Sequence, residues 1–160
     1  MNETTRKYDL AQLNIARMKT SMDDPVMADF VAALDPVNAS AETSEGFVWR
    51  LKDDDGNATS FRVFGDDRWL INLTVWDSLE ALKNFIASPD HLRIMRRRGE
   101  WFEKLANATT VLWWVPRGHR PTLEEAVERL EHLRHHGASK RVFGFSDPQP
   151  SPTRDEGERS

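Results

Sequence analysis

Hydrophobic and polar residues alternate along two segments of the chain, residues 8–17 and 69–76. A period of two residues predicts β-strands with two unlike faces. The apolar face of the second segment, which is expected to be core, consists of Trp69, Ile71, Leu73 and Val75. The other face carries Leu70, Asn72, Thr74 and Trp76, and Gln12 and Asn14 fall on the corresponding non-core face of the first segment.

Helices are expected where apolar residues recur every three or four positions behind a capping residue. One opens at Asp24-Pro25 and should kink or end at Asp35-Pro36, because a proline inside a helix loses a hydrogen bond. A second opens with Asp77 as its cap, bends or restarts at Ser88-Pro89 and continues through Leu105. A clean terminal helix begins at residues 121–125 and ends before Gly137.

Further strands are expected at residues 47–52 and 59–64, joined by a turn at residues 53–57, and at residues 109–115. A short edge strand is expected at residues 142–145. The resulting order, βαββαβ, predicts an α+β protein of the ferredoxin-like kind, with an antiparallel sheet, both helices on one face, and an extra C-terminal helix. The other face needs cover, which a second copy would supply, so we expect a homodimer with a small-molecule site between the exposed sheet face and its lid elements.

Composition narrows the functional classes. The 160 residues contain no cysteine, which excludes disulfides, thiolate metal sites and cysteine nucleophiles. A formal net charge of -4 gives no basic footprint for nucleic acid, and no apolar run is long enough to cross a membrane. We therefore expect a cytoplasmic domain over residues 8–146, with a flexible N-terminus at 1–7 and a disordered tail at 147–160.

The candidate site residues are Asn14, Asn72 and Trp76, with Gln12 and Thr74 beside them. Neutral amides can hold a carbonyl or enolate oxygen without a large desolvation cost, and an indole can stack on a flat ligand. The same residues also fit ordinary packing, with the amides bonded to the backbone and the indole in the core. Spacing alone leaves both interpretations open.

Other candidates are weaker. His91 lies in the first turn of the helix after Ser88-Pro89, where a neutral imidazole is favoured. His132 and His136 are four residues apart, a spacing that can bind a metal ion. Histidines are also favoured at the solvent-exposed C-terminal end of a helix by its dipole, and we therefore expect no metal site. The run 96–98, three arginines, can clamp an anion, although a salt-bridged solvent face explains it as well. Among the six tryptophans, Trp49 and Trp114 are further candidates for binding substrate.

The βαββαβ order, Asn14 and the segment Asn72-Leu73-Thr74-Val75-Trp76 before a helix resemble the dimeric α+β barrel superfamily, especially its antibiotic-biosynthesis monooxygenase branch. An uncharacterised bacterial family in that superfamily is also similar over about residues 8–146. That second resemblance is carried by five segments: Leu10-Ala11-Gln12-Leu13-Asn14-Ile15, Gly46-Phe47-Val48-Trp49-Arg50, Val75-Trp76, Arg96-Arg97-Arg98-Gly99-Glu100-Trp101-Phe102 and Leu112-Trp113-Trp114-Val115-Pro116.

The first resemblance implies a mechanism without metal, flavin or other cofactor. The substrate, an aromatic or polyketide-type compound of natural-product metabolism, loses a proton and the resulting enolate reduces O2 directly. Asn14 and Asn72 would stabilise the enolate while Trp76 positions the ring. The longer hairpin and the extra terminal helix depart from the minimal pattern of that branch.

Two alternatives remain. Haem-degrading members of the same superfamily use an asparagine, a tryptophan and a helix histidine, a set that Asn14, Trp76 and His91 match, although the separation between tryptophan and histidine is longer here. The chain is otherwise a non-catalytic dimeric module for ligand binding or stress response. The leading hypothesis is a cofactor-independent monooxygenase or a cyclase-like relative.

Overall fold

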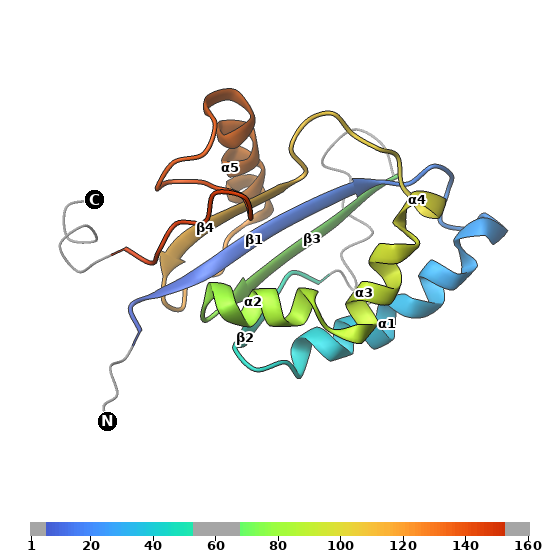
Figure 1. Cartoon of the computed structure of the whole chain (residues 1–160), viewed down its shortest axis with the longest axis horizontal. Coiled ribbons are helices and arrows are strands. Elements are labelled where there is room, and N and C mark those ends of the chain that lie inside the picture. Colours follow the sequence, from blue (N-terminus) through green and yellow to red (C-terminus); the bar gives the residue numbers. More distant parts are fainter. Residues whose placement is uncertain (1–5, 53–67, 153–160) are drawn as a thin grey trace.

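The computed structural model describes residues 6–52 and 68–152 (Figure 1). Its strands are β1 (Tyr8–Arg17), β2 (Phe47–Arg50), β3 (Trp69–Trp76) and β4 (Thr110–Pro116). Its helices are α1 (Ala28–Glu42), α2 (Leu79–Ile86), α3 (Pro89–Arg96), α4 (Arg98–Trp101) and α5 (Leu123–His136), with a 3-10 turn η1 (Pro25–Met27) before α1. None of the helices described combines the length and the apolar composition that crossing a bilayer requires.

The four described strands form one antiparallel sheet in the order β2-β3-β1-β4. This arrangement confirms the predicted α+β fold with β1 inside the sheet. Strands β1 and β3 pair in register along their whole length, from Leu10 opposite Trp76 to Arg17 opposite Trp69. The pairing places Asn14 directly opposite Asn72, so the two predicted site amides are neighbours on one face.

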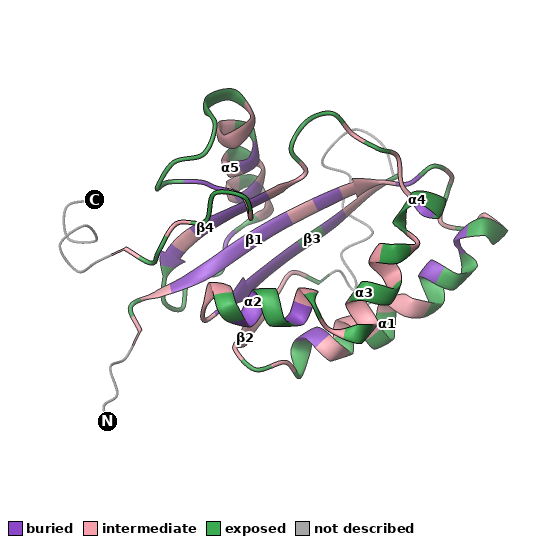
Figure 2. Cartoon of the chain, viewed as in Figure 1, coloured by how far each residue is buried: buried purple, intermediate pink, exposed green. Residues whose placement is uncertain are grey.

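Helices lie on both sides of the sheet (Figure 1). Helices α1 and α2 pack over the face that carries Leu10, Trp76 and Leu112. Helix α5 packs on the opposite face through Ala126 and Leu130. Figure 2 shows that the strands carry most of the buried positions, which agrees with a sheet enclosed between two layers.

The prediction that the face of Gln12, Asn14 and Trp76 is the uncovered one was wrong, because α1 and α2 cover it. The opposite face is core, as predicted, but α5 from the same chain already covers part of it, and its residues Leu13, Leu73 and Trp113 are buried in the single chain. The expected dimer was argued from an uncovered face, and the homodimer stays a prediction.

Two helix boundaries differ from expectation. Helix α1 runs through Pro36 to Glu42, so of the two predicted effects of Pro36, a kink or an end, the end is wrong. Its later half contributes Val37 and Ala41 to the core, and this burial offsets the backbone hydrogen bond that Pro36 cannot make. Ser78, and not Asp77, caps α2 by accepting a hydrogen bond from the Ala81 nitrogen.

The helix expected to continue through Leu105 is broken into α3 and α4. The Ser88 side chain caps α3, Pro89 is its first residue, and α4 ends at Trp101. Phe102 has extended backbone and pairs with Met18 at the end of β1. The break therefore ties this end of the helical layer to the sheet.

Near the C-terminus, Leu112 of β4 and Phe143 exchange two backbone hydrogen bonds of 2.7 and 2.9 Å, which places the expected edge strand as a single bridge. The predicted strand at 59–64 and its turn lie outside the described residues. Residues 147–152 of the predicted tail are described, and the Trp114 indole donates to the Gln149 carbonyl at 3.0 Å.

Gly46 fixes the entry into β2. Its φ of 86° lies in the left-handed region, and an added Cβ would sit 2.4 Å from the Ala81 Cβ and 2.5 Å from Asp77 Oδ1. We expect Gly46→Ala to lower the free energy of unfolding by about 1–3 kcal/mol, from backbone strain and this clash.

Chemical denaturation measures the effect, with Gly144→Ala as the control because nothing lies within 4 Å of its added methyl. Equal stabilities for the two variants would show that the close approach of Gly46 to α2 does not constrain the fold.

Candidate functional site

A cavity of about 800 Å³ lies between the polar face of the sheet and the helical layer. Its floor is formed by β1 and β3, and its apolar wall by side chains of α1, α2 and α3. The apolar wall residues are Phe30, Leu34, Val37, Phe85 and Ile94. A space of this size holds a small organic molecule of several rings.

Asn72 shows that the cavity reaches the sheet. β3 pairs with β1 along its length and with β2 only at residues 74–76, and Asn72 is its one exposed residue, between buried Ile71 and Leu73. Its amide has no hydrogen-bond partner among the described residues, and it lines the cavity. An unpaired amide at the floor of a cavity is available to a ligand oxygen.

Asn14 stands beside Asn72 on β1 and also lines the cavity. Its side-chain nitrogen donates to the Thr110 hydroxyl of β4 at 2.6 Å. This bond fixes the orientation of the Asn14 amide, while the amide of Asn72 is free to adapt. The two predicted amides therefore converge, and Thr110 is an orienting residue that spacing along one strand did not reveal.

Gln12, Thr74 and Trp76 form a hydrogen-bond chain beside the amides. The Trp76 indole donates to the Thr74 hydroxyl at 2.9 Å, and this hydroxyl donates to Gln12 Oε1 at 2.8 Å. All three side chains are buried, and of the three only Thr74 lines the cavity. Gln12 and Trp76 thus lie beside the floor on the same sheet face, outside the cavity lining.

An aromatic stack closes one side of the cavity. The Trp76 ring is fully buried and stacks on Phe85 at 5.3 Å between centroids, and Phe85 meets His91 edge to face at 5.2 Å. Phe85 and His91 line the cavity, so Phe85 separates Trp76 from it. Trp76 therefore positions the wall and does not itself offer a ring face to a ligand.

The surroundings of His91 favour its neutral form. Burial against the stack lowers the pKa of His91 below its usual value, and a polar contact with the Ile86 backbone opposes this shift only in part. Its Nδ1 atom is buried without a hydrogen-bond partner. A neutral imidazole with a shielded Nδ1 contributes shape and polarity to the wall more than charge.

Because Nδ1 is buried, only Nε2 of His91 could ligate a haem iron, and haem binding stays a prediction. The terminal histidines give no alternative. His132 and His136 stack with their ring centroids 4.7 Å apart, but no group of three potential metal ligands forms within residues 6–52 and 68–152.

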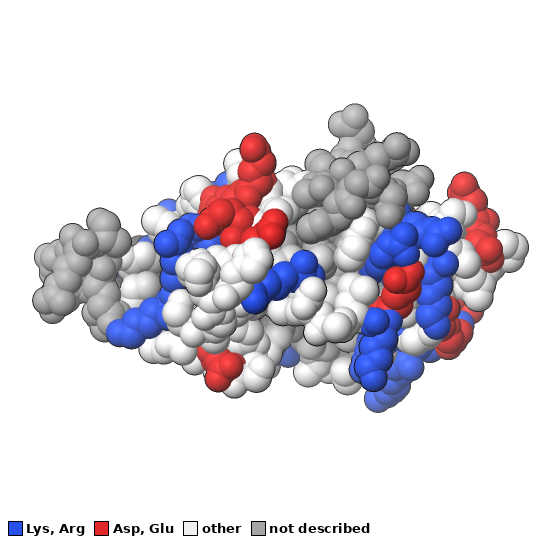
Figure 3. Space-filling view, turned by 90° about the horizontal axis from the view of Figure 1, so that it is seen from above, with Lys and Arg blue, Asp and Glu red and all other residues white. Residues whose placement is uncertain are grey.

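Cationic side chains line the end of the cavity near α3 and α4, where Lys and Arg gather on the surface (Figure 3). Of the three consecutive arginines, Arg96 and Arg98 line the cavity. Arg97 instead pairs with Asp29 and Glu100 and lies over the Trp101 ring at 4.8 Å. Arg97 thus forms the salt bridges that were predicted for a solvent-facing surface, whereas Arg96 and Arg98 line the cavity.

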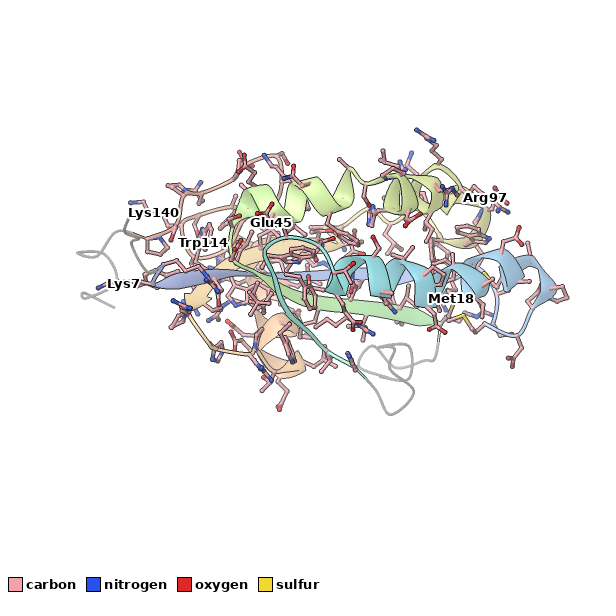
Figure 4. All side chains as sticks on the ribbon, turned by 90° about the horizontal axis from the view of Figure 1, so that it is seen from below. Lys7, Met18, Glu45, Arg97, Trp114 and Lys140 are labelled. Carbon is pink, nitrogen blue, oxygen red and sulfur yellow. The ribbon has the colours of Figure 1, made fainter. Side chains whose placement is uncertain are left out.

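Two predicted substrate contacts lie elsewhere. Trp49 packs with the core cluster on the α5 side of the sheet. Trp114 lies at the end of the sheet away from Arg97 (Figure 4), and neither tryptophan lines the cavity. Trp49 is outside the site because its side chain points to the opposite face of the sheet. Trp114 is outside it because it pairs with Leu10, at the far end of β1 from Asn14.

The pH dependence of stability tests the environment of His91. Because its pKa is lowered in the folded chain, the unfolded chain takes up a proton at about pH 6.5 before the folded chain does. We expect the free energy of unfolding to fall as the pH drops from about 6.5 toward the folded-state pKa, and His91→Gln to reduce this loss.

Urea unfolding at about pH 8 and about pH 5.5 measures the difference. The control is Asn84→Gln, on the exposed side of α2, which adds no titrating group. It should lose as much free energy of unfolding between the two pH values as the wild-type protein does. A His91→Gln variant with the same loss of stability as wild type would show that His91 is not buried as described.

The chain belongs to the family described as a domain of unknown function, DUF3291, whose model matches residues 9–159. No curated protein sequence is significantly similar to it.

Solved structures of similar shape include SnoaB, a cofactor-independent oxygenase from Streptomyces nogalater, at 17% identity over 73% of this chain and 98% of SnoaB, with a TM-score of 0.44. Rv0793 from Mycobacterium tuberculosis is 15% identical over 71% of this chain and 99% of its own, with a TM-score of 0.45. A conserved protein from Methanosarcina mazei Go1 is 13% identical over 68% of this chain and 92% of its own, with a TM-score of 0.49. Likeness at this level transfers no activity.

Proposed function

We propose that the cavity is the active site of a cofactor-independent oxygenase that acts on a flat aromatic substrate with an acidic C–H bond beside a carbonyl. The observation that carries this proposal is the pair of adjacent amides, Asn14 and Asn72, at the floor of a cavity with apolar walls. One amide is oriented by Thr110 and the other has no partner among the described residues, which is the arrangement an incoming oxygen atom requires.

The shape and polarity of the cavity support a flat substrate. Phe30, Phe85 and Ile94 supply apolar surface above the sheet, and the two neutral amides lie on the floor. A ring system between these layers would place a carbonyl oxygen over the amides while its apolar edges stay out of water.

The chemistry assigned to the site begins with loss of a proton from the substrate CH2 group, which leaves an enolate. An amide N–H of Asn72 donates to the enolate oxygen, and Asn14, held by Thr110, fixes the geometry beside it. The enolate then reduces O2, one oxygen atom enters the carbon as a new carbonyl, and the second leaves as water with the two hydrogens that the carbon lost. Substrate and O2 thus supply all atoms and electrons, and the protein supplies position and hydrogen bonds.

Gln12, Thr74 and Trp76 are positioning residues in this scheme. Their hydrogen-bond chain holds the Thr74 hydroxyl toward Gln12, and the stack on Phe85 fixes the cavity wall. Phe85, and not Trp76, is the ring that contacts the substrate in this scheme, because Phe85 lines the cavity and Trp76 lies behind it.

Oxygen consumption with anthrone as substrate tests the proposal. We expect Asn72→Ala to lower kcat by about 100-fold or more, because removal of one preorganised donor to a developing oxyanion has that effect in other enzymes. The matched control is Asn84→Ala, which removes an exposed amide from α2 outside the cavity.

Saturable anthrone binding without O2 consumption by the wild-type protein would contradict the oxygenase and favour a binding module. Equal kcat values for Asn72→Ala and Asn84→Ala would show that the turnover does not use the amide pair.

A further inference from the structure

The charges that line the cavity are strongly unbalanced. Four cationic side chains belong to its lining, and they come from β2, from α3, from α4 and from the segment after α4: Arg50, Arg96, Arg98 and Lys104. Glu103 is the one carboxylate among the described lining residues. This excess of positive charge occurs in a chain whose formal net charge is -4, so it is a local feature and does not reflect composition.

Glu103 does not neutralise these cations, because it forms an ion pair with Arg17 of β1. Arg50 is paired with Glu42 of α1. In the described part of the chain, Arg96, Arg98 and Lys104 form no ion pair, and Arg98 donates only to the Met95 carbonyl at 2.8 Å. Among the described residues, three cations at the α3–α4 end therefore have no carboxylate partner.

Cations of the same helical segment that do not line the cavity are paired. Arg93 of α3 forms an ion pair with Asp90 at 3.2 Å, and Arg97 forms ion pairs with Asp29 and Glu100 at 3.0 and 2.9 Å. The division follows the direction of the side chain: Arg93 and Arg97 have carboxylate partners, while Arg96 and Arg98 line the cavity without one. Unpaired cations around a concave, partly apolar surface attract an anion, since the low-dielectric walls focus their field.

We infer that the ligand of this cavity is an anion, an aromatic carboxylate whose acid group lies among Arg96, Arg98 and Lys104 while its ring system lies over the amide floor. This inference rests on the proposed function for the position of the ring, but its charge argument is independent of any turnover. Guanidinium groups suit a carboxylate because their N–H donors match its two oxygens. The acid group then fixes which edge of the ring faces Asn14 and Asn72.

Fluorescence titration with two probes of the same ring system tests the inference: anthracene-9-carboxylate and the uncharged 9-anthracenemethanol. We expect the carboxylate to bind at least about tenfold more tightly at low salt, with the difference shrinking between about 0.05 M and about 0.3 M salt. In the double variant Arg96→Gln/Lys104→Gln this preference should fall about tenfold while affinity for the alcohol stays within about twofold.

The matched control is Lys83→Gln/Arg93→Gln, which removes the same charge from α2 and α3 but at residues outside the cavity lining. It should keep the wild-type preference, and far-ultraviolet circular dichroism of both doubles should match the wild-type spectrum. Equal affinities of the wild-type protein for the two probes would overturn the inference. An equal loss of preference in both double variants would also overturn it, because the anion would then respond to overall charge and not to the cavity.

The two proposals fail separately. A carboxylate preference that depends on Arg96 and Lys104, without O2 consumption on anthrone or on an anthrone carboxylic acid, keeps the anion site and removes the oxygenase. Turnover of uncharged anthrone with no preference for the carboxylate probe keeps the oxygenase and removes the anion site.

Discussion

The structure depends on the need to keep the side-chain amide of Asn72 from being buried without a polar partner. Asn72 is exposed and lines the cavity, so a helix packed directly on this position would bury its amide. A buried amide without a partner costs about 1–3 kcal/mol. The helical layer instead leaves a cavity above the floor, and the neighbouring Asn14 is satisfied by Thr110.

The helical layer is built to span this cavity without filling it. Helix α1 continues through Pro36 and packs its later half on the sheet beside α2, while its first half packs with η1 and Trp101. The segment after α2 is broken by the Ser88 cap and by the end of α4, and Phe102 returns to pair with Met18. Several short helices therefore cover the cavity, and the chain contacts the sheet again at Phe102. A single long helix could not change direction in this way.

Local patterns in the sequence predicted most of the fold. Alternation located β1 and β3, and capping residues located α3 and α5, because these signals depend on neighbours along the chain. Which sheet face receives helices was predicted wrongly, since both faces of β1 carry apolar residues and the choice depends on where α5 packs. The pairing of Asn14 with Asn72 followed from topology, but the shielding of Trp76 by Phe85 depends on contacts between β3 and α2 that no spacing encodes.

The cavity is also asymmetric, and the asymmetry follows from the chain. The α2 side is closed by the stack of Trp76, Phe85 and His91, in which burial lowers the pKa of the imidazole. The α3–α4 side carries unpaired cations, because breaking the helix turns Arg96 and Arg98 toward the cavity while Arg97 finds carboxylates outside it. An apolar wall at one side and positive charge at the other give a bound molecule one favoured orientation. A single break in the helix therefore divides the three arginines: Arg97 pairs with Asp29 of α1, and Arg96 and Arg98 line the cavity.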